Sequence, residues 1–218
     1  LPVTGGNVSL YNETEGQEIW PTPVVGVIGV MPDARRHAAA SFQTPGDLIF
    51  MLGEPDDALG GSLYLQRLHG LHAGPLPELD LSREGRLIEV LVSGVAAGLI
   101  ISAHDVSDGG LAVTLAESCF GAPPAAAGAS VTLPETWITG RRMDGLLFGE
   151  GPGRVVISVR PADRAKVAEL AAAHDLSLWE LGTVAGGQLE IQAGGETLLT
   201  DTEKLAGVWR EAISCLMD

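Results

Sequence analysis

The chain of 218 residues is poor in basic side chains, in cysteine and in long apolar runs, and each shortage excludes a class of protein. Thirteen lysines and arginines stand against 28 aspartates and glutamates, a formal charge of −15, whereas a nucleic-acid-binding protein needs clustered basic residues to neutralise phosphates. The two cysteines, Cys119 and Cys215, make neither a disulfide framework nor a metal cluster, which favours the reducing cytoplasm as the compartment. No apolar run reaches about 18 residues and no basic-then-apolar leader is visible, so we predict neither a membrane span nor a signal peptide.

The sequence does carry the apolar residues of a folded protein, at 45% of the chain, which excludes intrinsic disorder. A continuous β-branched run at 24–30 and another apolar run at 47–53 predict strands that are buried on both faces. Apolar residues at four-residue spacing predict a helix over 82–98, and residues 154–184 have the pattern of a strand–helix–strand unit. Further strands are predicted at 7–12, 100–103, 129–133, 146–148 and 188–192, and further helices at 60–71, 111–120 and 202–216. We therefore predict an α/β or α+β protein with mixed sheets.

The beginning of the chain indicates a piece of a longer protein. No initiator methionine is present, and the pair Gly5 and Gly6 has nothing upstream to join, although glycine turns ordinarily connect two ordered elements. A polar connection over 31–44 and the turn at Pro45 and Gly46 predict a domain boundary. We expect residues 1–45 to end one domain and residues 46–218 to form another.

The same glycine pair opens the first candidate binding site, which reads TGGNVS at residues 4–9. Gly6 has no Cβ to keep a ligand from the backbone, and Asn7 offers a neutral oxygen of the kind that Mg²⁺ accepts beside a phosphate. Ser9 lies two residues further on, so its hydroxyl points to the same face of a strand as Asn7. A simple turn with polar side chains at its exit would have the same sequence, and the spacing alone leaves both interpretations open.

The second candidate site reads HDVSDGG at residues 104–110, where a predicted strand ends and a glycine pair opens a helix. The N–H groups and the positive dipole end of a helix attract anions, and Asp105 and Asp108 could hold a cation beside a bound phosphate. The alternative is a capping aspartate with a structural histidine. Glu150 follows an apolar run and faces either a pocket or a turn. Neither a P-loop nor a dinucleotide-binding glycine motif is present, so an ATP site here would be of another kind.

Four stretches of the sequence together match one family. They read PVTGGNVSLYNE at residues 2–13, PTPVVGVIG at 21–29, AHDVSDGGLA at 103–112 and LLFGE at 146–150. These stretches resemble the phosphoribosylformylglycinamidine synthase family, in its ATP-binding synthetase component, and the resemblance covers essentially the whole chain. It implies an aminoimidazole ribonucleotide synthetase-like fold made of two homologous halves. This chain resembles the end of the second half, where a C-terminal-type domain follows the end of an N-terminal-type domain.

The resemblance implies an enzyme that uses ATP to activate the amide oxygen of formylglycinamide ribonucleotide. Ammonia from glutamine then replaces that oxygen to give the amidine of purine biosynthesis. Mg²⁺ is the implied cofactor, and the implied partners are a glutaminase subunit, a small accessory subunit and the upstream part of the same chain. By this resemblance Gly6 contacts ATP, Asn7 binds Mg²⁺ and Ser9 contacts the ribonucleotide. Asp105 corresponds, through the homology of the two halves, to a metal-binding aspartate.

The sequence also departs from the family pattern. The family's catalytic histidine and proton acceptor lie in the first half, so we expect no catalytic residue here and no activity of this chain alone. A substrate-binding Glu-Ser-Gln stretch of the first half reads Glu150-Gly151-Pro152 here, which favours an auxiliary nucleotide site or a structural role. Two other functions stay open: a related ATP-dependent synthetase, such as the aminoimidazole ribonucleotide or selenophosphate enzymes, and a non-catalytic assembly module.

Overall fold

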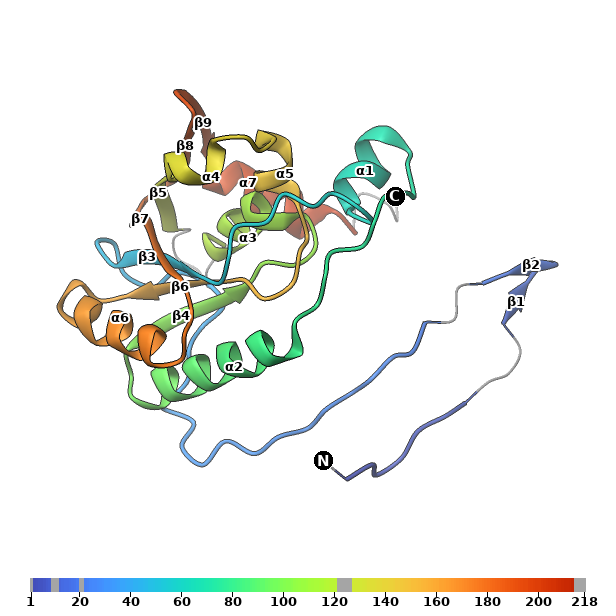
Figure 1. The fold of residues 1–218 in the computed structure, drawn as a ribbon, viewed down its shortest axis with the longest axis horizontal. Coiled ribbons are helices and arrows are strands. Elements are labelled where there is room, and N and C mark those ends of the chain that lie inside the picture. The colour runs from blue at the N-terminus through green and yellow to red at the C-terminus, as the bar shows by residue number, and fades with distance from the viewer. Residues whose placement is uncertain (1, 9–11, 20–21, 121–126, 214–218) are drawn as a thin grey trace. The chain divides into compact units, whose positions relative to one another are not determined.

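The computed structural model describes residues 2–8, 12–19, 22–120 and 127–213, and the chain divides into two compact units. The first unit runs from Leu1 to Ala34 and the second from Arg35 to Asp218 (Figure 1). The division falls inside the polar connection at 31–44. The domain boundary predicted at residue 45 stays a prediction.

The first unit contains a short hairpin of two antiparallel strands, β1 (Glu13–Thr14) and β2 (Gln17–Glu18). The strand predicted over 24–30 is wrong for the structure as described: these residues pair with no strand, and Val24 and Ile28 are 95% and 96% exposed. A strand buried on both faces needs neighbouring strands and covering side chains, which the described part of this unit does not supply. Of the strand predicted over 7–12, residues 9–11 lie outside the described residues.

The second unit is built on a seven-stranded mixed sheet of order β4-β6-β3-β7-β5-β8-β9. Neighbouring strands are antiparallel except β5 and β8, which are parallel. β6 and β7 each pair antiparallel with β3, so they run parallel to one another, and helix α6 (Arg164–Ala173) connects them. This confirms the predicted strand–helix–strand unit, with β3 inserted in its middle. The strands are β3 (Leu48–Leu52), β4 (Ile100–Asp105), β5 (Ala127–Thr132), β6 (Val155–Val159), β7 (Leu178–Gly186), β8 (Gln188–Ala193) and β9 (Glu196–Asp201).

Helices cover both faces of this sheet, which gives the second unit three layers (Figure 1). Strand β3 feeds both layers, because its side chains alternate: Ile49 and Met51 join one core, and Phe50 and Leu52 join the other. The first core contains residues of α3 (Gly110–Ser118), α4 (Glu135–Ile138), α5 (Met143–Phe148) and α7 (Thr202–Glu211), and the second contains residues of α2 (Leu81–Ala96) and α6. Helix α1 (Leu63–His69) and a 3₁₀ turn at Pro161–Asp163 complete the unit.

Most of the predicted elements of this unit are confirmed, and one is wrong. Strands β3, β4 and β6 and helices α2 and α3 begin and end within a residue or two of the predicted bounds. The strand predicted over 146–148 is instead the end of helix α5, because three apolar residues in a row fit both periods and here pack beside α3. Within the described part of the chain, every helix is too short or too polar to span a membrane.

Candidate functional site

The second predicted site lies where β4 ends and α3 begins, and its central contact is made by Glu150. The Oε1 atom of Glu150 accepts hydrogen bonds from the backbone N–H of Gly109, at 2.7 Å, and from that of Leu63, at 2.9 Å. Gly109 is the N-cap of α3 and Leu63 is the first residue of α1. One carboxylate thus ties the beginnings of two helices together, and its negative charge lies at the positive end of α3.

The glycine pair at the start of α3 is required by close backbone packing. Gly109 and Gly110 both have left-handed backbone, with φ of 80° and 71°. A Cβ on Gly110 would lie 2.7 Å from the Cα of Phe148 and from the carbonyl oxygen of Gly149. The hydroxyl of Thr114 donates back to the carbonyl oxygens of Asp105 and Gly110, each at 3.1 Å. The strand end, the helix start and the end of α5 are therefore held in fixed positions.

A buried cation holds the loop that carries Glu150. Arg154 is 3% exposed, and its guanidinium donates to the carbonyl oxygens of Gly149, at 2.8 Å, and Gly151, at 3.0 Å. Burial lowers the pKa of Arg154, and the nearby carboxylate of Asp56 opposes this shift. A Cβ on Gly151 would collide with that carboxylate. A serine at 151 would therefore require the Asp56 carboxylate to shift.

An aromatic stack and a hydrogen bond fix α1 against α5, and an ion pair at the beginning of α5 holds the acceptor of that hydrogen bond. The ring of Tyr64 stacks on Phe148 with centroids 5.2 Å apart and planes at 13°, and its hydroxyl donates to Asp144 Oδ2 at 3.2 Å. Arg142 donates two hydrogen bonds to the same carboxylate, from Nη2 at 2.5 Å and from Nε at 2.9 Å. The hydrogen bond from Arg142 is the largest cause that lowers the pKa of Asp144 to about 2. Burial, followed by the charge of Asp144, raises the pKa of Tyr64.

Asp105, the predicted metal ligand, closes strand β4 with its side chain 73% exposed. Beside it, His104 is mostly buried, with Nδ1 at 2.9 Å from the carbonyl oxygen of Asp105 and Nε2 at 3.4 Å from Glu117 Oε2. The described residues contain no cluster of three histidine, cysteine or acidic side chains arranged to hold a metal ion. Asp105 has the oxygen that a hard cation prefers, but its role as a ligand stays a prediction.

The residues of the first predicted site belong to the first unit. Gly6 and Asn7 are exposed, and a Cβ built on Gly6 would meet no atom within 4 Å, so this backbone is open to a ligand. Ser9 lies outside the described residues. The roles of Gly6, Asn7 and Ser9 therefore stay predictions.

Sequence reasoning named Glu150 and the glycine pair at 109–110 but missed the hydrogen bonds that fix Glu150. The donors Gly109 and Leu63 lie 41 and 87 residues from Glu150 along the chain, and such contacts leave no periodic pattern. Arg154 did carry a signal, because a lone arginine between a glycine-rich loop and an apolar strand must find acceptors when the strand is buried.

Comparison with known proteins supplies a family. A family model described as AIR synthase related protein, C-terminal domain, matches residues 44–193. The phosphoribosylformylglycinamidine synthase subunit PurL of Anaeromyxobacter dehalogenans is 42% identical over 223 residues, covering 99% of this chain and 28% of that protein. The subunit of the same name from Moorella thermoacetica is 42% identical over 217 residues, with coverage of 99% and 29%. The chain thus spans less than a third of the length of these curated relatives.

Solved structures agree in fold. Thermotoga maritima PurL complexed with FGAR superposes with a TM-score of 0.66 at 21% identity, covering 79% of this chain and 30% of that one. The same protein complexed with ATP gives a TM-score of 0.61 at 20% identity, covering 79% and 28%. These likenesses confirm the predicted synthetase-like α/β fold, and the curated relatives confirm the predicted family resemblance.

Proposed function

The chain belongs to the family of AIR synthase related proteins, whose C-terminal domain it contains at residues 44–193. From this premise we propose that the chain is part of an ATP-dependent ligase. The ligase would convert formylglycinamide ribonucleotide, with ammonia from glutamine, to formylglycinamidine ribonucleotide in purine biosynthesis. The observation that carries this proposal is the 42% identity, over 99% of this chain, to phosphoribosylformylglycinamidine synthase subunits. Structures of a relative complexed with ATP and with FGAR support the same two substrates.

Within that enzyme, the first unit would supply contacts to nucleotide and ribonucleotide. Gly6 would let ATP approach the backbone, since open space surrounds its Cα. Ser9 would contact the ribonucleotide through its hydroxyl. None of these groups titrates near neutral pH, so their contribution would be binding and orientation of the reacting groups rather than proton transfer.

Mg²⁺ would be held partly by side-chain oxygens of this chain. Asn7 and Asp105 carry the neutral and anionic oxygens that a hard cation prefers, and both side chains are exposed. The described residues contain no cluster of three histidine, cysteine or acidic side chains, so the further ligands of either residue's cation would come from ATP phosphates and water. When bound, the cation would neutralise phosphate charge.

A structural role fits Glu150 better than a role in binding substrate. Both hydrogen bonds that reach its Oε1 come from backbone N–H groups of its own chain, and the N–H of Gly109 is among those that a phosphate would otherwise use. We therefore propose that Glu150 positions α1 and α3 in this half of the enzyme. The partners proposed for the complete protein are a glutaminase subunit, a small accessory subunit and the upstream part of its own chain, in the cytoplasm. A structure of PurLQS from Thermotoga maritima supports assembly of a relative with other subunits.

Turnover assays on the full protein that contains this chain test the proposal. We expect amidine formation that requires ATP and formylglycinamide ribonucleotide, with ammonium salts as the nitrogen source, and no product from aminoimidazole or selenophosphate precursors. The isolated 218-residue chain should give no product. Failure of the full protein with formylglycinamide ribonucleotide, together with turnover of another synthetase substrate, would contradict the proposal. Nucleotide binding without any turnover would favour the non-catalytic assembly module.

A further inference from the structure

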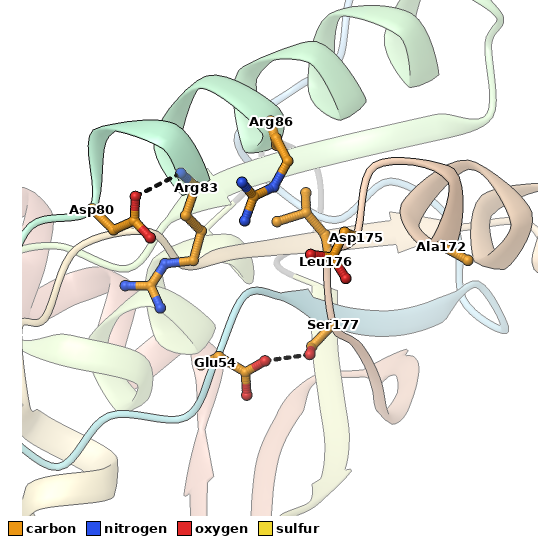
Figure 2. A pocket seen from close by; sticks show the side chains of 8 residues that line it. All are labelled: Glu54, Asp80, Arg83, Arg86, Ala172, Asp175, Leu176 and Ser177. Atoms are coloured by element: carbon orange, nitrogen blue, oxygen red, sulfur yellow. Dashed lines mark hydrogen bonds between the residues drawn. The ribbon is translucent and has the colours of Figure 1, made fainter.

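A polar pocket of about 530 Å³ lies in the second unit, where the beginning of α2 faces the connection from α6 to β7 (Figure 2). None of the residues that we propose to contact ATP, Mg²⁺ or ribonucleotide belongs to it. Pockets that hold small ligands fall in this size range. The lining residues are Glu54, Asp80, Arg83, Arg86, Ala172, Asp175, Leu176 and Ser177.

Two arginines on α2 line the pocket, and the Nε atom of each is buried without an acceptor among the described residues. Arg83 and Arg86 are three residues apart on the helix, so both side chains leave the same face (Figure 2). The Nε atom of each is buried and has no hydrogen-bond partner among the described residues, and neither guanidinium has an ion pair with a described residue. A buried donor without an acceptor is costly, which points to an acceptor from outside the chain.

Two of the three carboxylates around the pocket accept hydrogen bonds from groups other than the arginine side chains, and the third is exposed to solvent. Asp80 caps α2, because its Oδ1 accepts from the N–H of Ser82 at 2.9 Å and from that of Arg83 at 3.1 Å. Glu54 accepts a hydrogen bond from the hydroxyl of Ser177 (Figure 2). Asp175 is exposed and has left-handed backbone, with φ of 51°. Among the described residues, no hydrogen bond or ion pair joins these acids to the two guanidiniums, although the charges of Arg83 and Arg86 contribute, after the backbone N–H groups of the cap, to lowering the pKa of Asp80.

Gly153 and Glu84 lie beside the side chain of Arg83. Gly153 has φ of 76°, and a Cβ there would lie 2.9 Å from Glu84 Oε1 and 3.3 Å from Arg83 Nε. The missing side chain leaves room for Arg83 to cross this loop. Among the described residues Glu84 Oε1 is buried without a hydrogen-bond partner, and it lies beside the same glycine as Arg83 Nε, which makes Glu84 the control residue below.

We propose that this pocket binds a small oxyanion, a phosphate monoester or a carboxylate, through the guanidiniums of Arg83 and Arg86. The planar fork of an arginine matches two oxygens of either group, and its charge strengthens the hydrogen bonds. The volume exceeds that of an oxyanion alone, so the group would belong to a larger molecule. The exposed acids at the rim disfavour a polyphosphate and favour an anion that carries a single oxyanion group.

Calorimetric titration of the full protein tests this site, with inorganic phosphate and succinate as separate probes in a buffer free of both. We expect saturable binding of at least one probe. R83Q and R86Q should each weaken it about tenfold or more, as expected when a charge-assisted hydrogen bond is lost. R67Q removes the same charge from an exposed position outside the pocket and should leave the binding unchanged. E84Q should leave it unchanged or strengthen it.

Thermal unfolding without probe checks that R83Q and R86Q are folded, and R83K should retain part of the affinity because charge remains while the fork is lost. A phosphate response that only the pocket variants lose identifies a phosphate monoester site, and the same result with succinate identifies a carboxylate site. Equal binding by R83Q, R86Q and R67Q, or binding by none including the unsubstituted protein, overturns the proposal. No arm of this test depends on turnover, so it is independent of the proposed ligase activity.

Discussion

Glu150 is half-buried, and one of its carboxylate oxygens accepts hydrogen bonds from the backbone N–H groups of Gly109 and Leu63. Glu150→Ala should lower the free energy of unfolding by about 1–3 kcal/mol, because two partly buried N–H groups lose their acceptor. Glu150→Gln keeps an oxygen and should lose less. Glu196→Ala, at an exposed hairpin position, is the control and should stay within about 0.5 kcal/mol. Urea unfolding of the three variants measures this, and equal stability of Glu150→Ala and the control would exclude the bridging role.

Asn7 is the residue at which we expect function to be separable from folding. Its exposed side chain packs against little, so Asn7→Ala should cost at most about 1 kcal/mol of stability. In the full enzyme the same change should lower the rate on the order of 10²-fold, since Mg²⁺ demands near-octahedral coordination and misplaced phosphates react slowly. Steady-state kinetics against Mg²⁺ concentration measures this. Unchanged turnover with a lower melting temperature would show that the loop is structural.

Asp144 gives the stability of the second unit a defined acid dependence. Arg142 holds the pKa of Asp144 at about 2 instead of the ordinary 3.8, so the ionised form is favoured in the folded state. Its contribution is complete above about pH 4 and is lost as the pH falls toward 2. Because Arg142 is largely exposed, solvent reduces this contribution to roughly 1 kcal/mol. Chemical denaturation between pH 5 and pH 2 gives the free energy of unfolding at each pH. This free energy should fall less steeply with decreasing pH for Asp144→Asn and for Arg142→Gln than for the unsubstituted protein. The double variant should have the same pH dependence as either single variant.

At the scale of elements, the junction of α3 with the end of α5 tolerates no side chain. Gly110 and Gly187 have the same φ of 71°, but a Cβ on Gly110 meets backbone atoms at 2.7 Å whereas one on Gly187 meets nothing within 4 Å. Gly187→Ala should therefore cost about 1–2 kcal/mol, the strain of left-handed backbone alone. Gly110→Ala adds overpacking against Phe148 and should cost at least about 3 kcal/mol. Thermal unfolding of the pair measures the difference, and similar losses would mean that the helices separate easily.

The elements also show how far sequence patterns reach. Long apolar patterns predicted β3 and α2 because burial of a whole face repeats along the chain. The apolar run at 146–148 was too short to distinguish a strand from a helix. The run at 24–30 had strand chemistry but has no partner strand in the described structure, and pairing is what makes a strand. The glycine pair at the start of α3 was predictable from its sequence, whereas the bridge from Glu150 and the pocket at Arg83 depend on contacts between distant segments.

At the scale of the whole molecule, the two units should differ in backbone protection. Within the second unit, the N–H of Phe42 bonds to the carbonyl oxygen of Ser118 at 2.7 Å, and Ala39 forms a bridge with Ser102. Hydrogen exchange of the chain should therefore show protection at Phe42 and across β3, and fast exchange over the exposed residues 24–30. Uniform protection from 22 to 52 would contradict the division into units.

The position of β3 between β6 and β7 has a consequence for the synthesis of the chain on the ribosome. A ribosome makes β3 about a hundred residues before β6 and longer still before β7, the two strands that flank it. At ordinary elongation rates this interval lasts on the order of ten seconds. Throughout that time the apolar segment LIFML has no native neighbour on either edge, and such segments associate with other chains. Yield in a cell should thus depend on how well chaperones cover the nascent chain during this interval, and slower translation after Leu52 should lower it.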